Sequence, residues 1–532
     1  RSGRKMRHQL RLQTRLQNAL LRHYNINSQY KPHLIRDYWE PVIGLEIHAQ
    51  ISSISKLFSR VGTRYGAPPN TQVGIFESAH PGTLPVLNKR CVEAGIKTAL
   101  AFGATVNKIS LFDRKHYFYP DLPAGYQITQ LDYPLASNGR LEFIVLNSSL
   151  HKHPYRHSVD LLQLQLEEDS GKSIHDKDNN RVLVDLNRAG QPLMELVFAP
   201  GLRNGEEAAA MVKEVALILT RIGTCNGRMH EGALRVDANI SVHRPDEPLG
   251  TRTEVKNLGS IGSLLKAVDY EIQRQIDILE SGGNVTSETR SFDTHTQETI
   301  SMRDKEVIQD YRFMPEPNLL PLRLHDSSEP NCQYDGSLDI SKVRAKIPEL
   351  PEATRQKLIR DYGLSLENAF LLASKDDLLD YFMAVMSNTK RSSKLVCNLL
   401  LNNLLEALNS INTDITNSPL SASAFGEIVD LQQSCRIVTN ISQQVISAIC
   451  IERDSRSPTQ IVLDNNWLQL SNDVMEEIVE KILADNLELV EKYKKSKKKK
   501  LLNALMGKIN KASDNRANMK IVNDVLLKKL SS

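Results

Sequence analysis

Several acidic and histidine side chains stand at spacings that could bind a cation. Glu46 and His48 are two residues apart in the mainly apolar run Val42–Gln50, so on a β-strand their side chains share one face. Two ligands placed in this way could hold one metal ion. The alternative is the solvent-facing polar side of an edge strand, and this pattern alone favours that alternative.

Three successive acids, Glu167, Glu168 and Asp169, follow the apolar alternating run Leu161–Leu166. Like charges repel when they are crowded, and a divalent cation would relieve that repulsion. Mg²⁺ is typically held by one or two carboxylates together with phosphate and water. An exposed loop with ordinary acids would give the same letters, so both interpretations stay open at this point.

Two further stretches place charge among apolar or aromatic residues. Glu195 lies in the apolar stretch Pro192–Phe198, where a buried carboxylate would need a ligand or an ion-pair partner. Residues 112–121 interleave Arg114 and Lys115 with aromatics, a composition that can stack on bases and hold phosphates. The alternative is a strand that packs its aromatics inward, and composition alone favours it.

Composition and missing motifs narrow the class of protein. The chain has 532 residues, a net charge of +4 and six scattered cysteines, which is typical of a reduced, intracellular protein of two or three domains. No apolar run approaches the roughly 18 residues of a membrane span, so no membrane insertion is expected. The phosphate-binding patterns G-x-x-x-x-G-K-[ST] and G-x-G-x-x-G are missing, and no Gly/Ser-rich amidase loop is evident.

Alternation bounded by turn residues predicts strands, and helical spacing of apolar residues predicts helices between them. The expected strands are Val42–Gln50, Leu161–Leu166, Arg181–Leu186, Leu234–Val242 and Thr253–Lys256. The expected helices are Cys91–Phe102, Gly205–Ile222 and Ile261–Glu280. Together they predict an α+β fold that begins with a mixed, mainly antiparallel sheet.

From about residue 336 the sequence becomes poor in Gly and Pro and rich in Leu, Lys, Asn and Glu. We expect a sheet domain over residues 38–335, a helical linker over 336–388 and an all-helical tail domain over 389–532. Residues 492–500 hold seven lysines in nine positions. Such a run can be a solvated face, a nuclear localisation patch or a surface that contacts phosphates.

The first 36 residues carry nine Arg or Lys and no acid. Leu10, Leu12, Leu16 and Leu20 fall near one helical face. A basic, acid-free and amphipathic segment is typical of an organellar transit peptide, which we expect over residues 1–37. The alternative is a basic arm that contacts RNA.

Ten longer motifs run in one order along the chain. They are GLEIHAQ, PGTLPVLN, FDRKHYFYPDLPAGYQI, LEEDSGK, VDLNRAGQPLMELV, EGALRVDANIS, EVKNLGS, ETRSFD, MRDKE and DYRFMPEPNL. These motifs resemble the B subunit of the glutamyl-tRNA(Gln)/aspartyl-tRNA(Asn) amidotransferases. The match is dense from Trp39 to about Pro321 and looser from there to the C-terminus, and the N-terminal segment suits the mitochondrial form.

The resemblance implies a fold and a reaction. A cradle-shaped catalytic domain would bind ATP, Mg²⁺ and the acceptor end of mischarged Glu-tRNA(Gln), and the helical tail would hold the tRNA body. ATP would phosphorylate the side-chain carboxyl of the tRNA-bound glutamate, and ammonia from an amidase (A) subunit would displace the phosphate to give Gln-tRNA(Gln). A small C subunit would complete a heterotrimer in the mitochondrial matrix.

Positions that match the family motifs imply the site residues. The implied metal ligands are His48, Glu168 and Glu195, with Glu46 and Glu167 close by. The implied catalytic residues are Glu168, Lys115, Glu195 and Arg188. The implied ATP-binding residues are Arg114, Lys115, Asp237 and Asn239. Lys115 would meet phosphate or help amidation, and the two arginines would orient a carboxylate or a phosphate through paired hydrogen bonds.

The sequence departs from the family pattern in several places. Many bacterial members carry a Cys-x-Cys and Cys-x-x-Cys zinc site in the stretch corresponding to residues 57–82, which here has no cysteine, so we expect no structural zinc. Ala233, Gly259 and Asn318 stand where the family usually has Ser, Asn and Asp. Two other functions stay open: a non-catalytic tRNA-binding scaffold of the same complex, and a stand-alone ligase that acts on a small amino acid.

Overall fold

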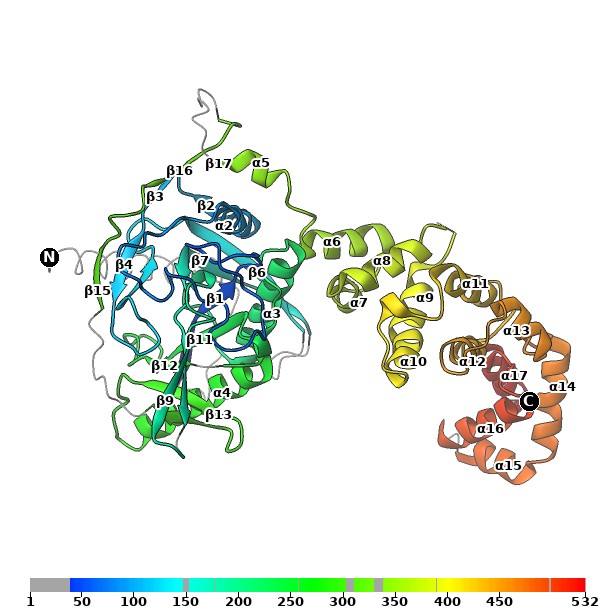
Figure 1. The fold of residues 1–532 in the computed structure, drawn as a ribbon. Helices are drawn as coiled ribbons and strands as arrows, with labels where there is room; N and C mark the ends of the chain where they lie inside the picture. Colours follow the sequence, from blue (N-terminus) through cyan, green and yellow to red (C-terminus); the bar gives the residue numbers. More distant parts are fainter. Residues whose placement is uncertain are drawn as a thin grey trace. The chain divides into compact units, whose positions relative to one another are not determined.

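The computed structural model describes residues 39–146, 153–176, 178–256, 258–302, 311–329, 338–388, 390–496 and 499–531 (Figure 1). The chain divides into two compact units, and the division falls between Pro351 and Glu352. The transit peptide expected over residues 1–37 lies outside the described residues.

A nine-stranded sheet forms the centre of the first unit. In spatial order its strands are β14 (Glu298–Ser301), β13 (Thr289–Asp293), β12 (Thr253–Lys256), β11 (Leu234–His243), β1 (Glu40–Gln50), β10 (Pro192–Phe198), β7 (Tyr155–Glu168), β6 (Ala136–Val145) and β2 (Thr105–Val106). Neighbouring strands pair antiparallel except β12 and β13, which are parallel. The expected α+β class with a mainly antiparallel sheet is therefore confirmed.

Strand β1 lies in the middle of this sheet, hydrogen-bonded to β10 on one side and to β11 on the other. The edge-strand interpretation of Glu46 and His48 is therefore wrong. Odd-numbered residues such as Ile43, Leu45 and Ile47 are buried, whereas the even-numbered polar ones are only partly covered. The alternation that predicted a half-solvated strand is real, but it separates an apolar face from a polar face of a central strand.

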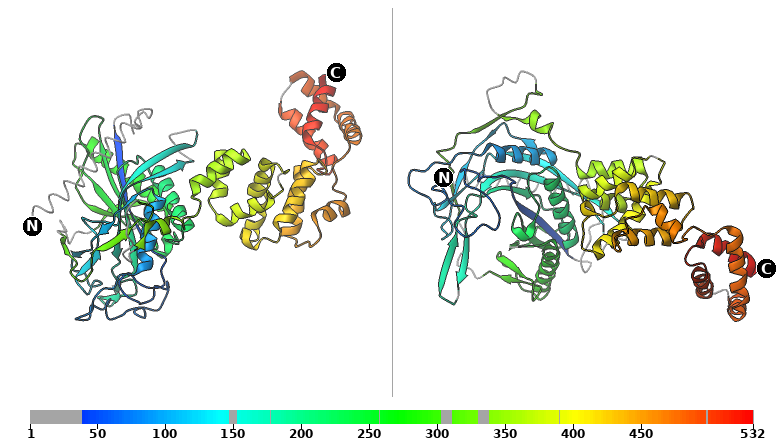
Figure 2. Two further views of the ribbon diagram at one scale, coloured as in Figure 1. Left: turned by 90° about the horizontal axis from the view of Figure 1, so that it is seen from above. Right: turned by 45° about the vertical axis from the view of Figure 1, so that its right-hand side comes forward.

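Three helices pack against the apolar face of the sheet and complete the core of the first unit (Figure 2). They are α2 (Lys89–Ala101), α3 (Gly205–Arg221) and α4 (Ile261–Glu280). Asn88, Asn204 and Ser260 cap their first turns by accepting backbone N–H groups, as short polar N-cap residues do. Because the three helices cover the apolar face, the opposite, polar face of the sheet is left available for a functional site.

Smaller sheets and one short helix complete the first unit. They comprise a three-stranded sheet of β15 (Arg312–Pro315), β4 (Asp113–His116) and β5 (Tyr126–Thr129), a second of β17 (Leu338–Asp339), β16 (Leu322–His325) and β3 (Ile109–Ser110), a hairpin of β8 (Lys172–Asp176) and β9 (Arg181–Asp185), and helix α5 (Ile340–Arg344). Strand β5 contacts β7, which brings residues 126–129 to the polar face of the main sheet.

The described part of the second unit is helical and contains two separate cores. The first core joins α6 (Pro351–Tyr362), α7 (Leu366–Ala373), α8 (Asp376–Val385), α9 (Ser393–Asn398), a π-helical turn (Leu399–Leu404), α10 (Leu405–Ser410), α11 (Ala422–Gln433), α12 (Thr439–Cys450) and α13 (Pro458–Asp464). The second joins α14 (Asn472–Ala484), α15 (Leu487–Ser496), α16 (Lys499–Ala512) and α17 (Met519–Ser531). Among the described residues, no helix is long and apolar enough to cross a membrane.

The boundaries of the helical region differ from those expected. Leu358, Leu372 and Phe382 lie in the segment expected to be a linker, yet they share one core with helices as far as α13. Helices of 8–12 residues cannot bury an apolar face alone, so these short helices pack into the neighbouring bundle. The structure therefore places residues 352–388 inside the second unit.

Candidate functional site

The polar face of the sheet carries a row of four side chains from four neighbouring strands. Arg235 on β11 and Glu195 on β10 both pair with His48 on β1, and Glu195 pairs in turn with Gln165 on β7. Directly paired residues of antiparallel strands point to the same face and lie within side-chain reach. Strand register, which joins residues up to 187 positions apart in sequence (235 minus 48), therefore assembles this row.

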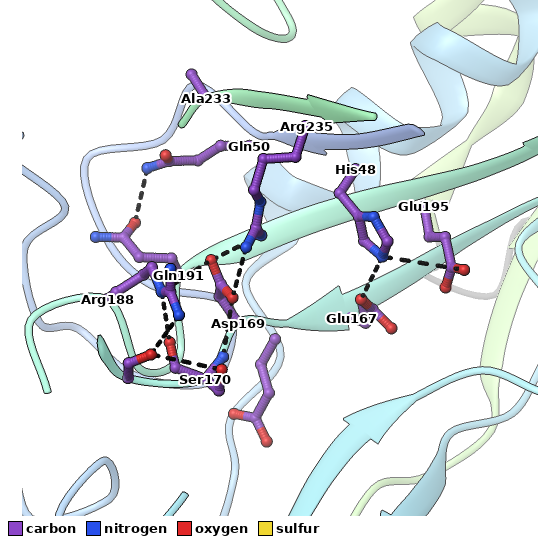
Figure 3. A network of polar contacts seen from close by, with 12 residues as sticks. His48, Gln50, Glu167, Asp169, Ser170, Arg188, Gln191, Glu195, Ala233 and Arg235 are labelled. Atoms are coloured by element: carbon purple, nitrogen blue, oxygen red, sulfur yellow. Dashed lines mark hydrogen bonds and ion pairs between the residues drawn. The ribbon is translucent and has the colours of Figure 1, made fainter. Parts of the chain in front are cut away.

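Two carboxylates converge on the ring of His48 (Figure 3). Nε2 of His48 lies 3.3 Å from Oε1 of Glu167 and 4.0 Å from Oε1 of Glu195. One ligand atom from each of the three residues lies within 4.8 Å of the other two. In the described part of the chain this is the only such group of three or more His, Cys, Asp or Glu residues.

The charges in this group are not balanced. Burial alone would lower the pKa of His48, but the hydrogen bond and negative charge of Glu167, with the charge of Glu195, raise it to about 9. Burial and the neighbouring Glu167 carboxylate raise the pKa of Glu195 to about 7. His48 outweighs the effect of burial on Glu167 and holds the pKa of that carboxyl well below its usual range. The positive charge of the His48 imidazole therefore stabilises the ionised form of Glu167, whereas the ionised form of Glu195 remains destabilised.

The structure places Glu168 apart from this group. Glu168 follows Glu167 on β7, so its side chain points away from Glu167, and its carboxylate accepts the backbone N–H of Ile128 at 3.0 Å. Burial and nearby acids raise the pKa of Glu168 to about 8, although the hydrogen bond from Ile128 opposes the rise. Of the two neighbouring glutamates, Glu167 shares the cluster with His48 and Glu195.

An ion pair that sequence reasoning missed borders the cluster. Asp169 accepts two hydrogen bonds from Arg235, at 2.8 and 3.3 Å, and Arg235 is the strand neighbour of His48. Arg188 donates to the backbone carbonyl of Ser170 at 3.0 Å and to that of Gly171, and its Nε lies 3.7 Å from Asp169. The sequence could have indicated Arg235, because it precedes Asp237 and Asn239 at intervals of two residues on β11. This spacing puts all three side chains on one face.

The other acids of the predicted site lie further along the same face. Glu46 accepts a hydrogen bond from Asn239 at 3.0 Å and pairs with Asp237 across the strands. Burial raises the pKa of Glu46, and the charge of Glu254 adds to the rise. Burial also raises the pKa of Asp237. Glu46, Asp237 and Asn239 therefore form a second polar group beside His48 on the same face.

The two cations of β4 differ in their partners. Arg114 makes paired hydrogen bonds to Glu316 at 2.6 and 3.0 Å and lies over the ring of Tyr126. Lys115 lies 4.6 Å from the centre of the Tyr311 ring, and its positive charge acts on Glu167 and Glu195. Arg114 thus holds β4 in place, whereas Lys115 faces the carboxylates.

Comparison with known families identifies the chain. The profile described as "GatB/GatE catalytic domain" matches residues 41–329, and the one described as "GatB domain" matches residues 380–530. The chain belongs to the GatB/GatE family. The resemblance inferred from the ten sequence motifs is thereby confirmed.

Similar curated proteins extend over nearly the whole chain. The B subunit of the mitochondrial glutamyl-tRNA(Gln) amidotransferase of Aedes aegypti is 46% identical over 505 residues, which are 94% of this chain and 95% of that protein. The human protein of the same name is 47% identical over 497 residues, covering 93% of this chain and 89% of its own length. The B subunit of the aspartyl/glutamyl-tRNA(Asn/Gln) amidotransferase of Rickettsia canadensis is 40% identical over 495 residues, covering 93% and 98%.

In this GatB/GatE member, hydrogen bonds hold the segment around residues 57–82, where many bacterial members carry a zinc site. The ammonium of Lys56 is fully buried and donates to the backbone carbonyl of Gln72 at 2.7 Å. Asn70 donates to Val184 and accepts from Leu186. The contacts of Asn70 join this segment to β9 and to the start of the loop that carries Arg188.

The donor set of this GatB/GatE site fits a hard divalent cation. Mg²⁺ usually takes one or two carboxylates from a protein, and phosphate and water supply its other ligands. Imidazole nitrogen is a good ligand for divalent transition metals, so Mn²⁺ is a suitable probe. His48, Glu167 and Glu195 are the residues of this chain that would hold the ion.

Proposed function

We propose that this chain is the carboxyl-activating subunit of a glutamyl-tRNA(Gln) amidotransferase in the mitochondrial matrix. Family membership and the names of the similar proteins support the subunit, the substrate and the mitochondrion. The convergence of His48, Glu167 and Glu195 on the polar face of the sheet carries the chemical part of the proposal.

Transfer of a phosphoryl group to a carboxylate brings two anions together and needs charge stabilisation more than covalent help from the protein. Mg²⁺ bound by His48, Glu167 and Glu195 would supply charge neutralisation at the phosphate oxygens of ATP. Lys115 faces the same carboxylates and is placed to meet a phosphate. Arg188, whose side chain is 43% exposed, can contact the incoming carboxylate or phosphate.

The remaining sequence-derived residues take supporting roles in this proposal. Arg114 is committed to Glu316, so it positions β4 and Lys115. Asp237 and Asn239 border the cluster from β11, and we assign them to the ATP side of the cradle. Glu168 is buried against β5, so we assign it to holding the end of β7 beside Glu167.

The nitrogen donor and the tRNA body require further partners. This sequence has no evident amidase loop, so ammonia would come from an amidase (A) subunit, with a small C subunit completing a heterotrimer. The lysines of α15 and α16 and the intervening segment would meet tRNA phosphates, because lysine contacts release counterions from nucleic acids.

The test is amide formation on purified Glu-tRNA(Gln) by the assembled complex, with ATP, Mg²⁺ and ammonium chloride as nitrogen donor. Ammonium bypasses the amidase subunit, so the assay isolates the chemistry of this chain. We expect Glu195→Gln to lower the rate of amide formation by about 100-fold or more, since one transition-state electrostatic contact is worth roughly 10²–10³ in rate.

Glu40→Gln is the matched control. Glu40 has the same residue type and the same parity on β1, but it lies at the far end of the strand beside His243. This variant should keep the wild-type rate. If Glu195→Gln also keeps the wild-type rate while tRNA still binds, the chain is a non-catalytic scaffold and the proposal is wrong.

A further inference from the structure

The carboxylates of Glu167 and Glu195 are oriented by contacts on both of their oxygens. On each residue, Oε1 faces Nε2 of His48, at 3.3 Å for Glu167 and 4.0 Å for Glu195. The other oxygen, Oε2, is held from behind by a donor that carries no charge. The two carboxylates therefore present one oxygen each to the same point.

The donors behind the carboxylates form one connected chain. The hydroxyl of Thr129 donates to Oε2 of Glu167 at 3.1 Å. The amide nitrogen of Gln165 donates to Oε2 of Glu195 and to the hydroxyl oxygen of Thr129, the latter at 3.4 Å. The carbonyl oxygen of Gln165 accepts from the amide of Gln163 at 2.9 Å. Each hydrogen bond of this chain is donated in the direction that leads to a carboxylate.

The direction of the chain is fixed by its ends. If the amide of Gln165 turned over, its carbonyl oxygen would face Oε2 of Glu195, and two acceptors would oppose each other. The amide of Gln163 would then face the NH₂ group of Gln165, and two donors would oppose each other. Thr129, Gln163 and Gln165 are all buried, where unmatched polar groups are most costly.

This arrangement differs from the buried acid–arginine pairs of the same unit. Arg235 binds Asp169, and Arg274 binds Glu271, so each of those carboxylates is oriented and neutralised by the same contact. Thr129 and Gln165 orient Glu167 and Glu195 without adding positive charge. The contacts on Oε2 thus fix the geometry of both carboxylates without cancelling their charge.

We propose that Thr129 and Gln165 are positioning residues that lock Glu167 and Glu195 into a cation-binding geometry. This inference rests on the proposed function and deepens it, because it assigns residues outside the ligand set to the affinity of the divalent-ion site. Gln163 supports Gln165 from the position two residues earlier on β7.

Binding of Mn²⁺ to the assembled complex, followed by electron paramagnetic resonance without ATP or tRNA, tests the inference. The site is assigned as the one that Glu195→Gln removes. Thr129→Val removes the donor while keeping the shape of the side chain, and we expect it to weaken Mn²⁺ binding by about 10- to 100-fold, the usual effect of losing a contact to a metal ligand. Gln165→Met should have an effect of the same order.

Two matched variants separate positioning from simple packing. Thr129→Ser keeps the hydroxyl and should restore Mn²⁺ affinity to nearly that of the wild type. Thr299→Val removes a buried hydroxyl that donates to Glu271 at 2.8 Å and accepts from Arg290, so it costs a similar buried hydrogen bond away from the site. It should leave Mn²⁺ affinity unchanged.

The outcomes are distinguishable. If the wild type has a Mn²⁺ site that Thr129→Val and Gln165→Met leave unchanged, the positioning role is wrong and the proposed function stands. If the wild type has no Mn²⁺ site that depends on Glu195, the proposed cation site fails, and the positioning role fails with it. If Thr299→Val loses as much Mn²⁺ affinity as Thr129→Val, the effect of Thr129→Val comes from altered packing and the positioning role is wrong.

Discussion

Two buried ionic networks lie in the same unit and shift the pKa of a central glutamate in opposite directions. In the first, Glu271 on α4 accepts hydrogen bonds from Arg274, Gln275, Thr253 and Thr299. These bonds outweigh burial and lower the pKa of Glu271. In the second, around His48, burial and neighbouring acids raise the pKa of Glu195 to about 7.

This difference is the one that we expect between a structural network and the cation site proposed above. Glu271 and Glu288 face Arg274 and Arg290, so two acids meet two cations and the network is complete by itself. Glu167 and Glu195 face one imidazole and the charge of Lys115, and only neutral side chains hold their outer oxygens. Strongly perturbed carboxylates in a concave or polar face are typical of functional sites.

The largest effect on stability is expected in the complete network. Glu271→Gln removes one buried acid and leaves an excess of cationic charge from Arg274 and Arg290. Breaking one partner of a buried pair costs about 3–5 kcal/mol, so the free energy of unfolding should fall by that amount in chemical denaturation. The amide-formation rate per folded molecule should stay that of the wild type. A stability loss under about 1 kcal/mol would show that this network is not structural.

A smaller effect, on activity, is expected at the border of the site. Asp169→Asn weakens the paired hydrogen bonds to Arg235 and releases the loop that holds Arg188. Misplacement of groups that orient a substrate can cost up to about 100-fold in rate, and we expect a loss of about 10- to 100-fold in ammonium-dependent amide formation. Asp160→Asn, at an exposed pair with Arg140, is the control. Equal rates for wild type and Asp169→Asn would show that the ion pair between Asp169 and Arg235 does not contribute to activity.

The affinity for Mn²⁺ should rise with pH, because a bound metal needs His48 neutral and Glu195 ionised. The pKa of His48 is about 9 and that of Glu195 about 7. Metal binding must therefore displace one proton, from His48, between pH 7 and 9, and a second proton, from Glu195, below about pH 7. We expect affinity to rise about tenfold per pH unit from about 7 to 9, more steeply below 7, and to level off above 9. An affinity that is flat between pH 7 and 9 would contradict the charge imbalance at this site.

The smallest effect concerns the second unit, where Lys499 and Lys500 are exposed and belong to neither network. Replacing Lys499 and Lys500 by Gln should weaken tRNA binding a few-fold and reduce its salt dependence. Each lost phosphate contact lowers the slope of log affinity against log salt by roughly 0.7–0.9. Titration of tRNA binding at several salt concentrations measures this slope. An unchanged slope would exclude these two lysines from the tRNA surface.

Local patterns predicted several of the elements but not their order in the sheet. Helix α4 lies at Ile261–Glu280 as expected, because its apolar residues fall at helical spacing in the sequence. Strand β10 was not predicted, since Pro192–Phe198 lacks alternation and resembles a buried helix segment equally well. Its place between β1 and β7 depends on pairing across long loops, which no local pattern encodes.

The same limit applies to the candidate site. The spacing of Glu46 and His48 fixed their shared face, but only the register of β1 with β10 and β11 brings Glu195 and Arg235 beside His48. Motif matching gave Glu168 as a metal ligand with Glu167 only close by, although the structure places Glu167 beside His48. Alternation along β7 distinguishes the two, because Glu167 has the same parity as Gln165 and so shares its face.

The most direct test compares Glu195→Gln with Glu271→Gln, measuring both amide formation and the free energy of unfolding for each. Because the pKa of Glu195 is higher in the folded chain than in the unfolded chain, its ionisation at neutral pH opposes folding, and the glutamine removes this cost. We therefore predict that Glu195→Gln loses activity and keeps or gains stability, whereas Glu271→Gln loses stability and keeps activity per folded molecule. If Glu195→Gln instead destabilises the fold and retains activity, the group around His48 is structural and the central claim is contradicted.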